Sequence, residues 1–102
     1  VMSYPPRIES AELRSFLTTR CRNSRLWFVN NAKLENATLG YAARYSQRYH
    51  VQLYAIAIEG NHIQAAAHFP LKNRALFMRD FNSSVARAVS RFTPEYEGGR
   101  FW

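Results

Sequence analysis

Residues 51–69 read VQLYAIAIEGNHIQAAAHF, and this stretch decides the fold. Residues 51–58 are apolar at nearly every position, which is typical of a strand covered on both faces. Gly60-Asn61 is a favoured hairpin connection, and the residues after it alternate in polarity. The apolar set is Ile63, Ala65, Ala67 and Phe69, and the opposite set is His62, Gln64, Ala66 and His68. The stretch predicts a central hairpin that presents His62 and Gln64 side by side on one face of a sheet.

One strand and one helix are predicted before this hairpin. Residues 13–22 are rich in Phe, Leu and Thr and lack Gly and Pro, which favours a strand with Arg20 and Arg22 among its polar positions. Asn31 suits a helix N-cap, and apolar residues then follow helical spacing. They form a tyrosine-rich face that comprises Leu34, Tyr41, Ala42, Tyr45 and Tyr49. We interpret these tyrosines as core residues, with stacking on bases as the alternative.

A second helix is predicted from about Asn73 to Phe92. Its apolar side comprises Phe77, Met78, Phe81, Val85, Ala88, Val89 and Phe92, and its other side carries Arg74, Arg79, Arg87 and Arg91. The segment Asn82-Ser83-Ser84 in the middle is unfavourable in a helix and favours a bend there. Both predicted helices thus have one apolar side that can pack on a sheet.

The predicted order of elements is strand, helix, strand, strand, helix. This order fits a ferredoxin-like α+β sandwich, which has a central antiparallel sheet and two helices on one face. A fourth strand is expected after the second helix, where it could begin only at about Gly99. We therefore expect a single domain over residues 1–102 that is truncated at its C-terminus, with residues 1–12 as a loop-like N-terminal arm. The final Phe101-Trp102 supports this, because natural termini seldom finish on two large exposed aromatics.

The charge of the chain predicts a polyanionic partner. It has 14 Lys+Arg against 7 Asp+Glu, a net charge of +7 and a pI near 10.2. Most of these cations are arginines, which form bidentate contacts with phosphate and stack on bases. A merely soluble basic surface is the alternative. The lone Cys21 excludes an internal disulfide and a zinc site built from several cysteines. The sequence shows no secretory signal or membrane-length apolar run, so we expect a cytoplasmic protein without membrane contact.

Three segments carry a resemblance to a known family. FLTTR at residues 16–20 is similar to the family's opening strand, and YAIAIEGNHIQ at residues 54–64 is similar to its metal-binding hairpin. FNSSVARAVSRF at residues 81–92, followed by GGRFW at residues 98–102, is similar to a later helix and its Gly/Trp exit. In this order and spacing they resemble single-tyrosine transposases of the His-hydrophobic-His nuclease superfamily, especially the insertion-sequence-200-like and REP-associated tyrosine transposases.

The resemblance implies a transposase that cleaves and joins single-stranded or hairpin DNA, uses Mg²⁺ or Mn²⁺ with a tyrosine nucleophile, and forms a homodimer. Carried onto this chain, His62 and Gln64 are the metal ligands, and Gln64 stands where the family has a second histidine. Hard cations accept its carboxamide oxygen. The family's nucleophile lies on a helix that would follow Trp102, so we expect this fragment alone to be inactive. Tyr96, in a Pro/Gly-rich segment, is a poor substitute.

The expected DNA-binding side chains are Arg20, Arg22, Arg87, Arg91 and Arg100. His68 lies further along the strand from His62, so we assign it a supporting or surface role, and we interpret His50 as a surface residue. Two other function classes stay open. One is a non-catalytic nucleic-acid-binding module of ferredoxin-like fold, against which the few aromatics on the strand of His62 argue. The other is a small-molecule or partner-binding α+β domain.

Overall fold

The computed structural model describes residues 14–96 and 98–102, so the predicted N-terminal arm lies outside the described residues. The elements are the strands β1 (Arg14–Arg20), β2 (Gln52–Ile58) and β3 (His62–His68), the short 3-10 helix η1 (Arg22–Ser24), and the helices α1 (Ala32–Arg48) and α2 (Arg74–Phe92). Their order is the predicted one. The predicted first strand stops at Arg20, because residues 22–24 turn into η1.

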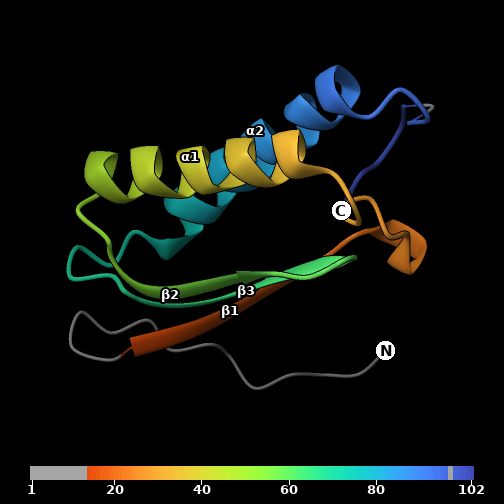
Figure 1. Ribbon diagram of the computed structural model, residues 1–102. Helices are drawn as coiled ribbons and strands as arrows, with labels where there is room; N and C mark the ends of the chain where they lie inside the picture. Colours follow the sequence, from red (N-terminus) through yellow and green to blue (C-terminus); the bar gives the residue numbers. More distant parts are fainter. Residues whose placement is uncertain (1–13, 97) are drawn as a thin grey trace.

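The three described strands form one antiparallel sheet in the order β1-β3-β2 (Figure 1). The hairpin is present as predicted: the Glu59 backbone N–H donates to the His62 carbonyl oxygen at 2.8 Å. On the other side of β3, the register pairs Leu17 of β1 with Ala65. β3 is therefore the central strand, with a neighbouring strand on each side.

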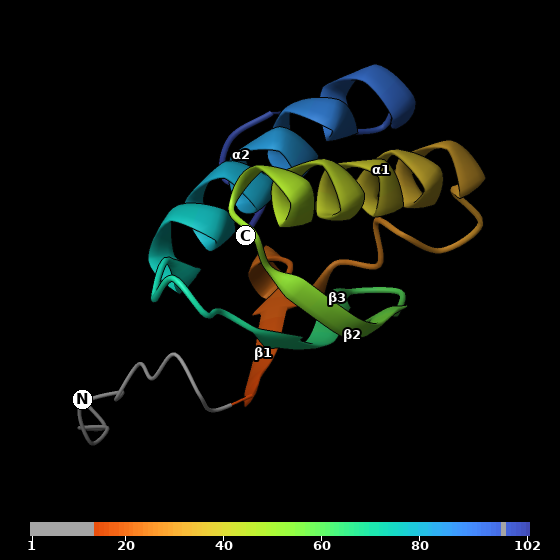
Figure 2. The same ribbon diagram turned by 90° about the vertical axis from the view of Figure 1, so that its left-hand side faces the viewer.

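Both helices lie on one face of this sheet, side by side, as Figures 1 and 2 show. The N-cap residue of each helix also donates a hydrogen bond to the residue that ends the other helix. Asn31 caps α1 through a 3.2 Å bond from the Leu34 N–H to its Oδ1, while its Nδ2 donates to Thr93 Oγ1 at 2.9 Å, just after α2. Asn73, before α2, donates to the Tyr49 carbonyl oxygen at 2.8 Å. These bonds fix an antiparallel helix pair above the sheet, which gives the two-layer α+β architecture expected.

The core fills the space between the helices and the sheet. Its largest fully buried side chains are Phe69, Leu34, Val85, Val89, Thr38 and Cys21. Tyr45 is buried among them and Tyr41 and Tyr49 are half-buried, so these tyrosines are core residues as predicted. Phe101 is buried at 3% exposure and packs edge-on against Phe28, 5.9 Å between ring centroids. Apolar area removed from water is what holds this tail in place.

Among the described residues, no strand follows α2. Residues 98–102 instead run past the end of β1, where the Arg22 N–H donates to the Phe101 carbonyl oxygen at 2.8 Å. The Trp102 indole N–H donates to the Asn82 carbonyl oxygen of α2 at 2.8 Å. The segment that was expected to begin a fourth strand near Gly99 therefore links the sheet end to α2.

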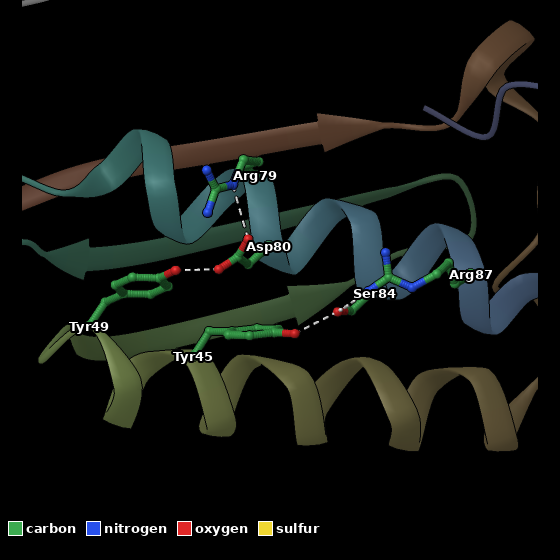
Figure 3. Close-up of polar contacts among 6 residues, drawn as sticks. All are labelled: Tyr45, Tyr49, Arg79, Asp80, Ser84 and Arg87. Carbon is green, nitrogen blue, oxygen red and sulfur yellow. Dashed lines mark hydrogen bonds and ion pairs between the residues drawn. The ribbon is translucent and has the colours of Figure 1, made fainter.

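The middle of α2 is continuous, although Asn82-Ser83-Ser84 favoured a bend. Ser84 is buried and its hydroxyl lies 2.7 Å from the Tyr45 hydroxyl of α1, while Arg87 Nη2 donates to Ser84 Oγ at 3.1 Å (Figure 3). A serine is unfavourable in an isolated helix because its hydroxyl competes for backbone groups. Here a partner on α1 occupies that hydroxyl, so the tertiary contact outweighs the local preference.

The prediction that β2 is covered on both faces is wrong. Leu53, Ile56 and Ile58 are half-buried toward the helices, but the other residues of the strand are exposed. These exposed residues are Gln52, Tyr54, Ala55 and Ala57. On the exposed side the apolar appearance came from Ala55 and Ala57, which lose little free energy when they remain in water, and from Tyr54. No described element covers this second face, which we call the outer face.

Candidate functional site

The two predicted metal ligands lie on the outer face of β3. Ile63 between them is buried at 4% exposure beneath the helices, whereas Gln64 is exposed and His62 is half-buried. The two side chains therefore project from the same side of the central strand, as the alternation predicted. On the neighbouring strand β1, Arg20 pairs with His62 and Thr18 pairs with Gln64. Cross-strand partners share a face, so Arg20 stands beside the candidate ligands.

A hydrogen bond orients the His62 ring. Its Nδ1 lies 2.8 Å from the Asn61 side-chain oxygen. Because a carboxamide oxygen only accepts, Nδ1 is the donor in this hydrogen bond and Nε2 is the ring nitrogen left to bind a metal. Nε2 has no partner among the described residues. Histidines that bind metals are typically held in this way, with the second ring nitrogen donating to an oxygen.

The donor set at this place is small. Gln64 supplies a carboxamide oxygen that makes no side-chain hydrogen bond to another described residue. Glu59 is exposed and is the hairpin neighbour of His62. Within residues 14–96 and 98–102, no three His, Cys, Asp or Glu side chains come together in a cluster that could hold a metal ion by itself. His62 and Gln64 can therefore provide two ligands of a hard cation, which commonly completes its shell with water or phosphate oxygens.

A shallow groove of about 360 Å³ runs over the outer face between the three strands. Gln64 and Thr18 line it, and alanines of β2 and β3 form its floor. Phe16 of β1 also lines it and is 82% exposed, while Tyr54 of β2 is 49% exposed. The exposure of Phe16 and Tyr54 on this face was not predicted, because the alternation of residues 62–69 describes the strand of His62 alone. The alternation of residues 16–20 places Phe16 in phase with Arg20, but only the register Phe16 to Ala66 brings it beside β3.

The other two histidines lie away from His62. His68 is at the opposite end of β3, where its Nδ1 is 3.0 Å from Gln52 Oε1; the Tyr54 hydroxyl donates to the same oxygen at 3.0 Å. His50 is exposed in the turn before β2 with a positive φ of 54°. His68 is thus part of a surface hydrogen-bond network on the outer face, in keeping with the supporting or surface role assigned to it.

The five predicted DNA-binding arginines fall into two groups. Arg20 is exposed on the outer face, and Arg22 and Arg100 line a cavity just beyond the end of β1. Arg87 and Arg91 are on α2, in the helix layer, where Arg91 lies over the Phe92 ring at 5.6 Å. The first group is therefore at one end of the sheet with His62, and the second is not.

The remaining reactive side chains have structural explanations. Burial raises the pKa of the Cys21 thiol to about 11, so it stays protonated at neutral pH and is neither a nucleophile nor a ligand. Between the helices, the Tyr49 hydroxyl and then the Arg79 guanidinium lower the pKa of the Asp80 carboxyl by hydrogen bonding to it (Figure 3). The same bond to Asp80 raises the pKa of Tyr49. This network joins α1 to α2 and lies on the helix side of the sheet.

No protein-family model matches this chain, and no curated protein matches it. Neither α1 nor α2, the long helices of the described part, is apolar enough to cross a membrane. Function is therefore inferred from the outer face: its two metal-capable side chains, its exposed aromatics and the arginines at one end of the sheet.

Proposed function

We propose that this domain binds single-stranded or hairpin DNA on its outer face and belongs to a metal-assisted transposase of the single-tyrosine type. The observation that carries the proposal is the placement of His62 and Gln64 together on the outer face, with His62 Nε2 making no hydrogen bond to a described residue and Arg20 as cross-strand neighbour. The reaction is inferred from the resemblance. The outer face supports the proposal because Gln64 and Arg20 are exposed there, where a DNA strand can contact them.

The outer face has the two features that single-strand binding requires. One is positive charge, from Arg20 on the face and from the net +7 of the chain. The other is exposed aromatic surface on which bases stack, here Phe16 and Tyr54. A duplex hides the faces of its bases inside the stack. We therefore expect single-stranded and hairpin DNA to bind better than a duplex of the same length.

His62 and Gln64 fit two positions of a Mg²⁺ or Mn²⁺ shell. The imidazole is pre-oriented by Asn61, and the carboxamide oxygen of Gln64 suits a hard cation as well as the histidine that the family has there. A cation at this place would stabilise negative charge on a phosphate oxygen. Arg20 adds a fixed positive charge at the neighbouring position, where it can orient the same phosphate.

The transposase reaction also needs a tyrosine, which the resemblance places after Trp102. Tyr96 is a poor substitute in the structure as well, since its hydroxyl donates to the Gly99 carbonyl oxygen at 2.5 Å and it lines the cavity beyond β1. We expect residues 1–102 to form no covalent DNA adduct with Mg²⁺ or Mn²⁺, and a chain extended through the next helix to form one. An adduct abolished by Tyr96→Phe would show that the nucleophile was misplaced.

Metal binding can be tested without catalysis. Mn²⁺ added to the labelled protein should broaden the NMR signals of His62 and Gln64, and His62→Ala should abolish this effect. Asn61→Ala should weaken Mn²⁺ binding by about 10- to 100-fold, as loss of a ligand's orienting partner usually does. His68→Ala is the matched control, because it removes a histidine from the same strand and face but from the other end. Equal loss in both histidine variants would overturn the metal site.

A second candidate function is a non-catalytic module that binds single-stranded nucleic acid by stacking. The exposed ring of Phe16, at 82%, favours it over the small-molecule alternative. The two candidates differ in their metal dependence. If Phe16→Ala weakens DNA binding while Mn²⁺ never binds at His62, the module is the correct interpretation. The homodimer that the resemblance implies is checked by light scattering of the eluted protein.

A further inference from the structure

A small cavity lies where the segment after β1 meets the end of the chain. Its volume is about 190 Å³, and three of its lining residues are arginines: Arg22, Arg25 and Arg100. Trp27 and Tyr96 form part of its wall. We call this cavity the arginine pocket. It is smaller than the roughly 300–1,000 Å³ of pockets that hold whole drug-sized ligands, so it suits a single phosphate or part of one nucleotide.

We propose that the arginine pocket binds one phosphate of a single-stranded DNA, with the adjacent base against Trp27. The inference rests on the proposed function for the identity of the strand, and it adds a second contact point beyond the His62 face. The chemistry shared by DNA and free nucleotides is the phosphate, which guanidinium groups recognise through paired hydrogen bonds.

The charged side chains that line the pocket favour binding of an anion. Arg22, Arg25 and Arg100 are all exposed, and none of them forms an ion pair with a described residue. Glu95 is the only carboxylate among the described lining residues, so three arginines stand against one carboxylate in the described part of the lining. Like charges brought together in this way repel each other, and a bound phosphate relieves the repulsion.

The pocket is built by specific contacts rather than by loosely placed side chains. Trp27 packs edge-on against Tyr96 at 5.4 Å between centroids, and Arg25 lies over the Trp27 ring at 4.7 Å. A guanidinium held over an aromatic ring is already oriented for a phosphate beside a stacked base. Gly98 and Gly99 form the far side with positive φ values of 92° and 83°, and a Cβ at either position would meet nothing within 4 Å. Both glycines are exposed, so no described side chain crowds this part of the lining.

The pocket and the candidate metal ligands lie at the same end of the sheet, because β1 ends at Arg20, the cross-strand partner of His62, and Arg22 of the pocket follows two residues later. The Cys21 N–H donates to the Asn61 carbonyl oxygen at 2.8 Å, and the Phe28 N–H donates to the Gly60 carbonyl oxygen at 3.0 Å. These bonds fasten the segment that carries Arg22 and Arg25 to the turn immediately before His62. A strand that crosses the outer face at His62 can thus continue into the pocket.

The test compares two triple variants that each remove three positive charges. The pocket variant is Arg22→Gln/Arg25→Gln/Arg100→Gln, and the control is Lys33→Gln/Arg44→Gln/Arg48→Gln on the exposed side of α1. Binding of a labelled oligothymidylate is measured by fluorescence anisotropy over a range of salt concentrations. We expect at least about tenfold weaker binding for the pocket variant, as for loss of a charge-assisted hydrogen bond. The slope of log K against log salt should fall by about 0.7 for each phosphate that the variant no longer neutralises.

The outcomes separate this inference from the proposed function. If the wild-type chain binds the oligonucleotide and both triple variants weaken binding equally, the pocket inference is wrong and the function stands. If the wild type binds no single-stranded DNA at low salt but binds thymidine monophosphate or inorganic phosphate in an Arg-dependent way, the pocket stands as a phosphate site and the function fails. Circular dichroism melting of both variants verifies that the fold is retained.

A substitution of Glu95 should change DNA affinity in the opposite direction to the arginine substitutions. Replacing it by Gln removes the carboxylate that lines the same cavity and should tighten oligothymidylate binding about two- to fivefold, the range expected for one exposed charge interaction. A pocket that merely holds the chain end in place would lose affinity or show no change. Unchanged or weaker binding by Glu95→Gln would therefore overturn the phosphate assignment.

Discussion

The two faces of β3 differ more than any other two regions of this molecule. On the inner face, Ile63 and Ala67 are 4% and 0% exposed beneath the helices. On the outer face, Gln64 is exposed and His62 is half-buried, with no described element above them. Adjacent residues of one strand thus have different physical roles. The inner face supplies the hydrophobic stabilisation, and the outer face contributes little to it.

The difference identifies the outer face as the place where function is expected. Phe16 and Tyr54 are large exposed aromatics, and isolated exposed apolar residues are common on protein surfaces. Here, however, Phe16 lines a groove together with Gln64, Tyr54 lies on the same face, and His62 and Arg20 stand at one end of that face. Exposed aromatics, a basic side chain and a metal-capable pair on one face are not needed for folding, and they are the features that the proposed DNA binding would use.

The largest expected effect comes from the two neighbouring positions Ile63 and Gln64. Ile63→Ala removes buried methyl groups and should lower the free energy of unfolding by about 2–5 kcal/mol. Gln64→Ala should change it by no more than about 0.5 kcal/mol, because the side chain is exposed and unpaired among the described residues. Urea denaturation measures both. Equal destabilisation by the two substitutions would mean that the faces are not distinct.

A smaller effect is expected at the contact between the helices. Tyr45→Phe and Ser84→Ala each remove one hydroxyl of a buried pair 2.7 Å apart, and each should cost about 1–3 kcal/mol. The double variant should cost less than the sum, since neither hydroxyl is then left facing a missing partner; the exposed Arg87 loses its bond to Ser84 Oγ in the single and double Ser84 variants alike. A double-mutant cycle from urea denaturation gives the coupling. Strict additivity would show that Tyr45 and Ser84 do not interact.

The smallest effect is expected from the charge network of Asp80. The hydrogen bond from Tyr49, followed by that from Arg79, lowers the pKa of the Asp80 carboxyl below its ordinary 3.8. A lowered folded-state pKa stabilises the fold above pH 3.8, and this contribution disappears as the pH falls through the folded-state pKa. Asp80→Asn should therefore remove part of the acid-dependent loss of stability. If the melting temperatures of wild type and variant fall equally with acid, the Asp80 network does not contribute to stability.

The alkaline side of the same network has the opposite sign. Its hydrogen bond to Asp80 raises the pKa of Tyr49 above the ordinary 10.0. A raised folded-state pKa stabilises the fold below pH 10.0, and this contribution is lost as the pH rises through the folded-state value. Tyr49→Phe should remove the loss of stability at alkaline pH. Because Asp80 then loses its hydrogen bond from Tyr49, its pKa should rise, and the loss of stability in acid should begin at a higher pH. Melting curves on both sides of neutrality test the two shifts together.

Much of the fold could be predicted from the sequence because the decisive signals are local. The alternation of residues 62–68 determined which side of β3 faces the core, and Asn31 marked the start of α1. Ser84 could not be interpreted in this way, because its partner Tyr45 is on another helix. The exposed face of β2 was not predicted because its residues Tyr54, Ala55 and Ala57 look apolar whether or not anything covers them.

The candidate site was only partly predictable for the same physical reason. His62 and Gln64 are two residues apart, so a single strand periodicity brings them together. Phe16 lies beside β3 only because β1 pairs with β3 in a register that places it opposite Ala66. Arg25 and Arg100 line the same cavity only because residues 98–102 pack beside the segment after β1. No local pattern contains that information. The arginine pocket therefore depends on the tertiary placement of residues 98–102 beside the segment after β1.

The central claim is that DNA binds the outer face at the end where Arg20 and His62 lie. It is tested most directly by titrating an isotope-labelled chain with a short oligothymidylate and following backbone amide shifts by NMR. The account predicts the largest changes at Thr18, Arg20, His62 and Gln64, with little change at Lys33 and Arg44 on the far side of α1. Changes concentrated on α1, with the outer face unaffected, would contradict it.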